Sequence, residues 1–172
     1  MKKRTGRILW AAALALLAAV LVSVNLPDKK PSAGAAEGEL LPDFAVTCLN
    51  GDTFRLSEQR GKTVVINIWA TWCAPCVKEL PHFDRLLRER PGEVAVLAVH
   101  APPVTADVNE YLSAFTYVIP FAVDGTGTLN DTLDIRSVLP QTVIVSPDGI
   151  VTYNRSGALS YEELAALADK AA

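Results

Sequence analysis

The fold of this chain follows from residues 64–76, which read Val64-Val65-Ile66-Asn67-Ile68-Trp69-Ala70-Thr71-Trp72-Cys73-Ala74-Pro75-Cys76. The segment 63–69 is a continuous apolar and β-branched run, which is typical of a strand buried on both faces. From Ala74 onward the apolar residues follow helical spacing until Pro91-Gly92, where a helix should end. The sequence therefore predicts a buried strand that leads directly into a helix, with both cysteines at the junction.

Two cysteines three residues apart at a helix start have a specific chemistry. They can close a small disulfide loop, and the unpaired N–H groups and dipole of the helix stabilise a thiolate on the first cysteine. Pro75 suits the first helical turn, where a missing N–H costs nothing. The alternatives are a structural disulfide and half of a zinc site. Zinc requires four ligands, and Cys48, His82 and His100 show no paired spacing, so a redox-active pair is favoured.

The rest of the domain alternates strands and helices. The predicted elements are a hairpin of 44–49 and 53–56 around Asn50-Gly51-Asp52, a strand at 93–99, a helix at 105–115 capped by Thr105 or Asp107, a strand at 119–123, a loop at 124–132, a hairpin of 141–145 and 150–154, and a last helix opened by a capping box at Ser160. This order predicts an α/β fold with a mixed central sheet, helices on both faces and an N-terminal β-hairpin.

Composition limits the function further. The chain has 172 residues, three cysteines and a net charge of −3. Residues 1–30 hold six Lys or Arg and one Asp, so residues 31–172 hold ten basic and 18 acidic side chains. An acidic body repels nucleic acid, and nucleic acid is therefore not expected as a partner.

The N-terminus has the pattern of a membrane segment. Residues 1–7 are basic, residues 8–22 are fifteen uninterrupted apolar residues, and the run extends to Leu26. No good cleavage site lies near Val24, so an uncleaved anchor over 1–26 is favoured over a cleaved signal peptide. The basic end should stay in the cytoplasm and the remainder should be exported. Residues 27–40 are predicted to be a linker and residues 41–172 the folded domain.

On these residues the chain resembles the thioredoxin superfamily, and within it the membrane-anchored TlpA/ResA-like group. The resemblance covers about residues 40–170. It rests on residues 64–76, on Lys78-Glu79-Leu80-Pro81, and on the N-terminal hairpin from Pro42-Asp43-Phe44 to Gly61-Lys62. It implies a thioredoxin-like fold and no cofactor or metal.

The resemblance also implies roles. Cys73 would be the exposed attacking thiol and Cys76 the buried resolving thiol. Asn67 stands where thioredoxin has a buried Asp that shuttles the proton of the resolving cysteine. Our hypothesis is that Glu79, three residues after Cys76 on the same helical face, tunes Cys76 and relays its proton instead. The alternative is that Glu79 is a solvated helix charge.

Three residues are predicted to bind substrate. Pro140 stands where thioredoxin folds have a cis proline facing the cysteine pair, and the backbone of Leu139 would pair with an extended substrate peptide. Trp72 lies directly before Cys73 and is expected to pack the site. The family usually has Thr after this proline and this chain has Gln141, which leaves substrate preference open.

The implied function is reduction of disulfides in exported proteins, with apocytochrome c as a client and a membrane protein that carries electrons outward as the partner. An oxidant or isomerase of the same fold is one alternative. A Cu(I) chaperone is another, although a further His ligand and a longer Cys spacing are not evident. A thiol peroxidase would require a Pro-x-x-x-Thr-x-x-Cys pattern that the chain lacks. Cys48 is expected to be a core thiol.

Overall fold

In the computed structural model the described residues are 31–104, 106–125, 127–136 and 138–172. The predicted anchor over 1–26 and the first residues of the predicted linker lie outside them. Among the described residues, no helix is both long and apolar enough to span a membrane.

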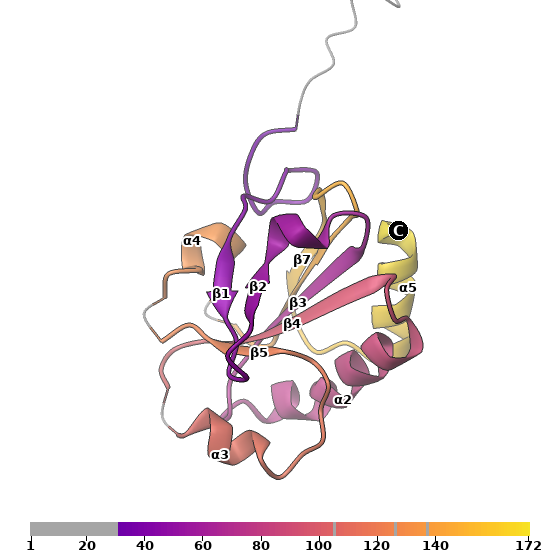
Figure 1. Cartoon of the computed structure of the whole chain (residues 1–172). Coiled ribbons are helices and arrows are strands. Elements are labelled where there is room, and N and C mark those ends of the chain that lie inside the picture. Colours follow the sequence, from indigo (N-terminus) through magenta and orange to yellow (C-terminus); the bar gives the residue numbers. More distant parts are fainter. Residues whose placement is uncertain (1–30, 105, 126, 137) are drawn as a thin grey trace, which may run out of the picture. The chain divides into compact units, whose positions relative to one another are not determined.

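The centre of the domain is a five-stranded mixed sheet in the order β5-β4-β3-β6-β7 (Figure 1). Its strands are β3 (Thr63–Trp69), β4 (Val94–His100), β5 (Phe121–Val123), β6 (Gln141–Val145) and β7 (Val151–Ser156). β3, β4 and β5 run parallel, whereas β6 pairs antiparallel with both β3 and β7. Every residue of β3, β4 and β6 is buried, which explains their apolar sequences.

Three helices pack on one face of the sheet: α2 (Ala74–Glu89), α3 (Val108–Leu112) and α5 (Tyr161–Ala171). Figure 1 shows α2 and α5 side by side. α5 begins with the predicted capping box, in which the hydroxyl of Ser160 and the carboxylate of Glu163 each bind the other residue's backbone N–H. α3 is shorter than predicted at both ends: Asp107 caps it and fixes its start, and it ends at Leu112.

The opposite face is covered mainly by the predicted N-terminal hairpin, β1 (Ala45–Thr47) and β2 (Thr53–Arg55). It also carries the 3-10 turn η1 (Leu56–Gln59) and the one-turn helix α4 (Asn130–Leu133). Side chains alternate along β3: Val65 and Trp69 face the α2 side, and Ile66 faces the hairpin side. The thioredoxin-like fold is therefore confirmed, with the larger helices on one face.

Residues 32–40 differ from the prediction, which placed 27–40 in a linker. Gly38 N donates to Val151 O, and Val151 N donates to Glu39 O, both at 2.8 Å. Ala35 is buried, and its carbonyl accepts a hydrogen bond from Asn154 Nδ2. This part of the chain lies along β7 and belongs to the folded body.

Candidate functional site

Cys73 and Cys76 form a disulfide at the N-terminus of α2, with their Cα atoms 5.3 Å apart. Cys73 is the N-cap residue, and its Sγ accepts a hydrogen bond from Cys76 N at 3.4 Å. The resemblance implies an exposed Cys73, but in this oxidised form it is only 6 % exposed, against 0 % for Cys76. Both sulfurs pack into the core on the α2 side of the sheet, and Cys73 is the one that reaches the surface.

In the turn that leads into α2, Thr71, Trp72 and Cys73 each donate a hydrogen bond. Cys73 N donates to Ala70 O at 3.1 Å, and Thr71 N donates to Nε2 of His100 at 3.0 Å. The indole N–H of Trp72 donates to Pro103 O at 3.2 Å, although the side chain of Trp72 is 51 % exposed. The end of β4 and the residues after it therefore fix the approach to the disulfide.

His100 is a site residue that was not among the predicted site residues, although its place at the end of a strand near the active edge made contact with substrate conceivable. Its side chain is completely buried and packs edge-on against the ring of Trp69. Because Nε2 accepts the hydrogen bond from Thr71, the ring proton of the neutral imidazole is on Nδ1. Burial lowers the pKa of His100, which favours this neutral form. A signal existed in the sequence, since His100 ends a strand whose carboxyl end lies beside that of β3.

Glu79 is buried in α2, at 2 % exposure, and is not a solvated helix charge. Asn67 Nδ2 donates to its Oε1 at 2.7 Å, and Leu159 N donates to its Oε2 at 3.0 Å. Burial raises the pKa of Glu79 to about 7, and the hydrogen bonds from Leu159 and Asn67 only partly oppose this rise. A carboxyl group with this pKa exchanges a proton near neutral pH.

His82, on the same helix, supports Glu79 through the backbone of Leu159. It is half buried, and its Nδ1 donates to Leu159 O at 3.0 Å. The backbone of Leu159 is therefore bound on both sides by α2 side chains, through His82 and Glu79. This arrangement fixes the N–H group that contacts the Glu79 carboxylate.

The Leu139–Pro140 peptide bond is cis, as the resemblance implies. Leu139 and Trp72, which are separated by 67 positions in the sequence, line the same surface cleft of about 190 Å³. The other lining residues are Ala101, Pro102, Asn130, Ile135 and Arg136. The cleft thus brings together two of the three residues predicted to bind substrate.

Cys48 lies apart from this site on the hairpin side of the sheet. It is a free thiol and is buried, as expected for a core residue. Burial raises its pKa, which disfavours the reactive thiolate. Within the described residues, no group of three or more His, Cys, Asp or Glu side chains is arranged to hold a metal ion.

The fold and the Cys73–Cys76 disulfide together define a thioredoxin-like redox protein. The chain belongs to the Redoxin family, which matches residues 36–169. It is 30 % identical over 167 residues to the thiol-disulfide oxidoreductase ResA of Geobacillus kaustophilus, covering 95 % of each chain. It is also 30 % identical over 138 residues to the thioredoxin-like protein YneN of Bacillus subtilis, covering 78 % of this chain and 80 % of YneN.

The solved structures agree with this assignment. The exposed lipoprotein thioredoxin Etrx1 of Streptococcus pneumoniae superposes with a TM-score of 0.68 at 27 % identity, covering 75 % of this chain and 99 % of that one. The chain is accordingly an enzyme of the thiol–disulfide oxidoreductase class, in the ResA-like part of the thioredoxin superfamily.

Proposed function

We propose that this protein reduces disulfides in exported proteins through a cycle of Cys73 and Cys76 between dithiol and disulfide. The observation that carries the proposal is the position of the cysteine pair. It lies at a helix N-terminus, beside an exposed tryptophan and a surface cleft, with a buried acid of raised pKa on the same helix.

In the first step the thiolate of Cys73 attacks one sulfur of the client disulfide. The client S–S bond breaks, a Cys73–client mixed disulfide forms, and the released client thiolate takes up a proton. The N-terminus of α2 supports the attacking thiolate, because its free N–H groups and dipole favour negative charge.

In the second step Cys76 attacks Sγ of Cys73 and releases the second client thiol. Cys76 must first lose its proton, and we assign the acceptor role to the carboxylate of Glu79. Asn67 can assist at both stages, since its amide donates to the carboxylate or, after a flip, accepts from the carboxylic acid. The client gains two electrons and two protons, and the enzyme ends as the Cys73–Cys76 disulfide.

The cycle then requires a reductant, and a membrane protein carrying a dithiol would regenerate the reduced enzyme. Residues 1–26 would anchor the chain in the cell membrane, with the domain on the extracytoplasmic side, connected by a linker that ends near residue 31. Apocytochrome c is our proposed client, because its haem-attachment cysteines must be free thiols. Trp72, Leu139 and Pro140 would bind the client segment.

The reduction potential of the Cys73–Cys76 pair tests the direction of electron flow. A value near that of thioredoxin, about −270 mV, is expected for a reductant, whereas a value near that of DsbA, about −120 mV, would indicate an oxidant. The measurement is equilibration in graded thiol buffers followed by trapping of free thiols, with Cys48→Ser to remove the third thiol.

A second experiment tests the roles of the two cysteines. The Cys76→Ser variant should accumulate a mixed disulfide between Cys73 and a disulfide-bearing peptide, because no second thiol is present to resolve it. Cys73→Ser should accumulate none. An equal yield of adduct from both variants would contradict the assignment.

A further inference from the structure

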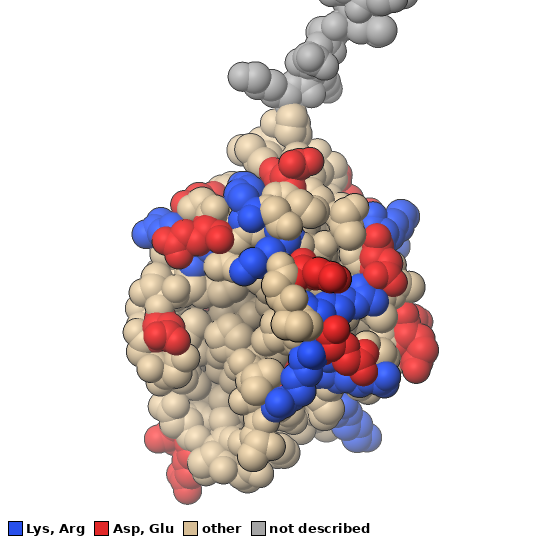
Figure 2. All heavy atoms as spheres, turned by 45° about the vertical axis from the view of Figure 1, so that its right-hand side comes forward, with Lys and Arg blue, Asp and Glu red and all other residues tan. Residues whose placement is uncertain are grey.

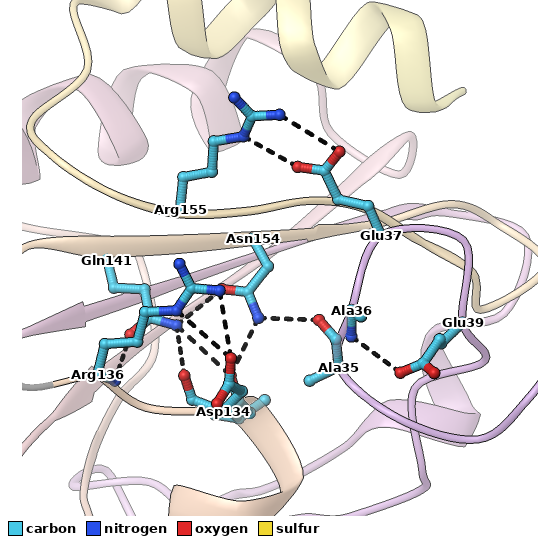
Figure 3. A network of polar contacts seen from close by, with 10 residues as sticks. Ala35, Ala36, Glu37, Glu39, Asp134, Arg136, Gln141, Asn154 and Arg155 are labelled. Carbon is cyan, nitrogen blue, oxygen red and sulfur yellow. Dashed lines mark hydrogen bonds and ion pairs between the residues drawn. The ribbon is translucent and has the colours of Figure 1, made fainter.

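Gln141 joins β6 to the segment that follows α4 (Figure 3). Its side chain is buried, and it lies directly after Pro140. Its Nε2 donates to Asp134 O at 2.9 Å and to Asn154 Oδ1 at 2.7 Å, and its Oε1 accepts from Arg136 N at 2.8 Å. One side chain therefore satisfies two backbone groups of the segment after α4 and one neighbouring amide.

The same network continues into β7 and the N-terminal segment. Asn154 Nδ2 donates to Ala35 O at 2.9 Å and to Leu133 O at 3.3 Å. Figure 3 shows these groups pointing toward one another from four separate parts of the chain. Because a buried polar group without a partner is costly, each member of the network restricts the positions of the others.

The segment fixed by Gln141 forms one wall of the cleft beside the disulfide. Ile135 and Arg136 line the cleft. Neither residue belongs to a helix or a strand, since α4 ends at Leu133. The N–H of Ile135 donates to Asn130 O at 3.0 Å, and the two Gln141 hydrogen bonds, at Asp134 O and at Arg136 N, fix the backbone on either side of Ile135. The remaining walls include Trp72 and Leu139.

We propose that Gln141 is a positioning residue for client recognition, which holds Ile135 in place so that the cleft accepts an apolar side chain next to the client cysteine. The proposal rests on the function proposed above. The cleft lining mixes polar and apolar groups: Asn130 and Arg136 are polar, and Ala101, Pro102, Ile135, Leu139 and the indole of Trp72 supply the hydrocarbon surface that an apolar side chain would contact. An apolar side chain gains free energy there by leaving water, whereas a glycine at the same position gains nothing.

The test compares the full chain with its Gln141→Met variant, which keeps side-chain length and removes the three hydrogen bonds described above together with a longer one, at 3.5 Å, to Leu133 O. The substrates are two peptides with an intramolecular disulfide, one with Leu and one with Gly beside the cysteine, and 2-hydroxyethyl disulfide. For the variant, KM for the Leu peptide should rise about fivefold, the effect of losing a contact of ordinary strength. KM for the Gly peptide and KM for the small disulfide should change less than twofold. The reduction potential should not change.

Two further variants separate recognition from stability. Ile135→Ala should raise KM for the Leu peptide to a similar extent, and the double variant should be no worse than either single one, since both act on one wall. Asp84→Ala removes two comparable hydrogen bonds, to Val118 N and Arg88, outside the cleft, and should leave KM unchanged.

Two results would overturn the inference. One is an unchanged Leu preference in the Gln141→Met variant. The other is an equal loss for all three substrates together with a shifted potential, which would place Gln141 at the reaction centre or in global stability. Failure of the wild-type chain to reduce any of the three substrates would instead refute the proposed function itself.

Discussion

Glu79 places a carboxyl group where water is almost excluded, and two hydrogen bonds are not enough to keep its acidity normal. Donors from Asn67 and Leu159 favour the charged form, but the loss of hydration outweighs them and the pKa rises to about 7. Asp or Glu residues with full solvation titrate near pH 4 and could not exchange protons with a thiol efficiently. The burial of this one side chain is thus what makes it suitable for proton transfer.

This pKa has a consequence for the stability of the oxidised protein. The folded state holds the Glu79 proton more tightly than the unfolded chain, whose carboxyl group titrates near pH 4.5. The resulting stability is fully present below about pH 4.5 and is lost as the pH rises to about 7. The loss should amount to about 3 kcal/mol.

Urea unfolding of oxidised wild type and Glu79→Gln between pH 4 and pH 8 measures this effect. The difference between the two curves should change across that window, with wild type gaining relative to the variant at low pH. His100 also titrates differently in the two states, with the opposite sign, but it is present in both proteins and cancels. Parallel curves would show that Glu79 keeps an ordinary pKa.

His100 should hold the turn before Cys73 through its single acceptor nitrogen. His100→Leu fills similar space but leaves Thr71 N without a partner, which should cost about 1–3 kcal/mol of stability. The loosened turn should also raise the pKa of the Cys73 thiol, because the helix N–H groups no longer meet it in a fixed position. His100→Gln supplies an amide oxygen near the position of Nε2 and should retain most of both properties.

Urea unfolding and the pH dependence of alkylation of reduced Cys73 are the two measurements. If His100→Gln behaved like His100→Leu in both, the ring itself would be needed for packing against Trp69, and its hydrogen bond would not be the reason.

At the scale of elements, the strands and helices whose residues favour them locally could be predicted from the sequence. The contacts between distant residues could not. The bounds of β3 and β6 match the sequence prediction, and α2 starts at the expected Ala74, because apolar runs, helical spacing and Pro75 act within the segment itself. The partner of His100, Thr71, lies 29 residues earlier, so only the place of His100 at the end of a strand pointed to the site. Gln141 binds Asp134 and Arg136 in the irregular segment just before it, and no periodic pattern marks such contacts.

Residues 32–40 show the same limit most clearly. Their Pro, Gly, Ala and charged residues have the composition of a linker, and no periodic pattern marks a helix or a strand. They are ordered because β7 offers free backbone groups and Asn154 offers an amide, both more than 100 residues further along the chain. The conformation of such a segment is set by the strand with which it pairs and not by the secondary-structure propensity of its own residues.

The attachment predicts that the domain needs these residues. A chain that begins at residue 41 should be less stable than one that begins at residue 31 by about 2–4 kcal/mol, since it loses several hydrogen bonds and the burial of Ala35. Chemical denaturation of the two oxidised chains measures the difference. As a control, Arg155→Ala removes the exposed ion pair with Glu37 and the contact of the guanidinium with the Tyr153 ring, and should cost about 1 kcal/mol or less. Equal stability of the two chains would show that residues 32–40 contribute nothing to the stability of the domain, as expected for a linker.

At the scale of the described domain, charge is mixed over the surface near α2 and α5. Figure 2 shows acidic and basic side chains close together in the upper and right-hand parts of this face, and few charged residues toward its lower part. Ion pairs such as Arg85–Glu89 and Arg90–Asp169 belong to α2, its C-cap and α5. Exposed pairs of this kind contribute little to stability, so the fold depends on its two apolar layers instead.

The cover over both borders of the sheet has a consequence for aggregation. β5 is bridged by Cys48 and Leu49 of the hairpin, and β7 is bridged by Gly38 and Glu39. Uncovered border strands template the addition of foreign strands, and unfolded polypeptides can supply such strands. Here the protein's own N-terminal chain occupies the border of β5 and the start of β7, at Val151. A molecule built in this way can meet unfolded chains repeatedly at its cysteine pair without becoming a seed for their deposition.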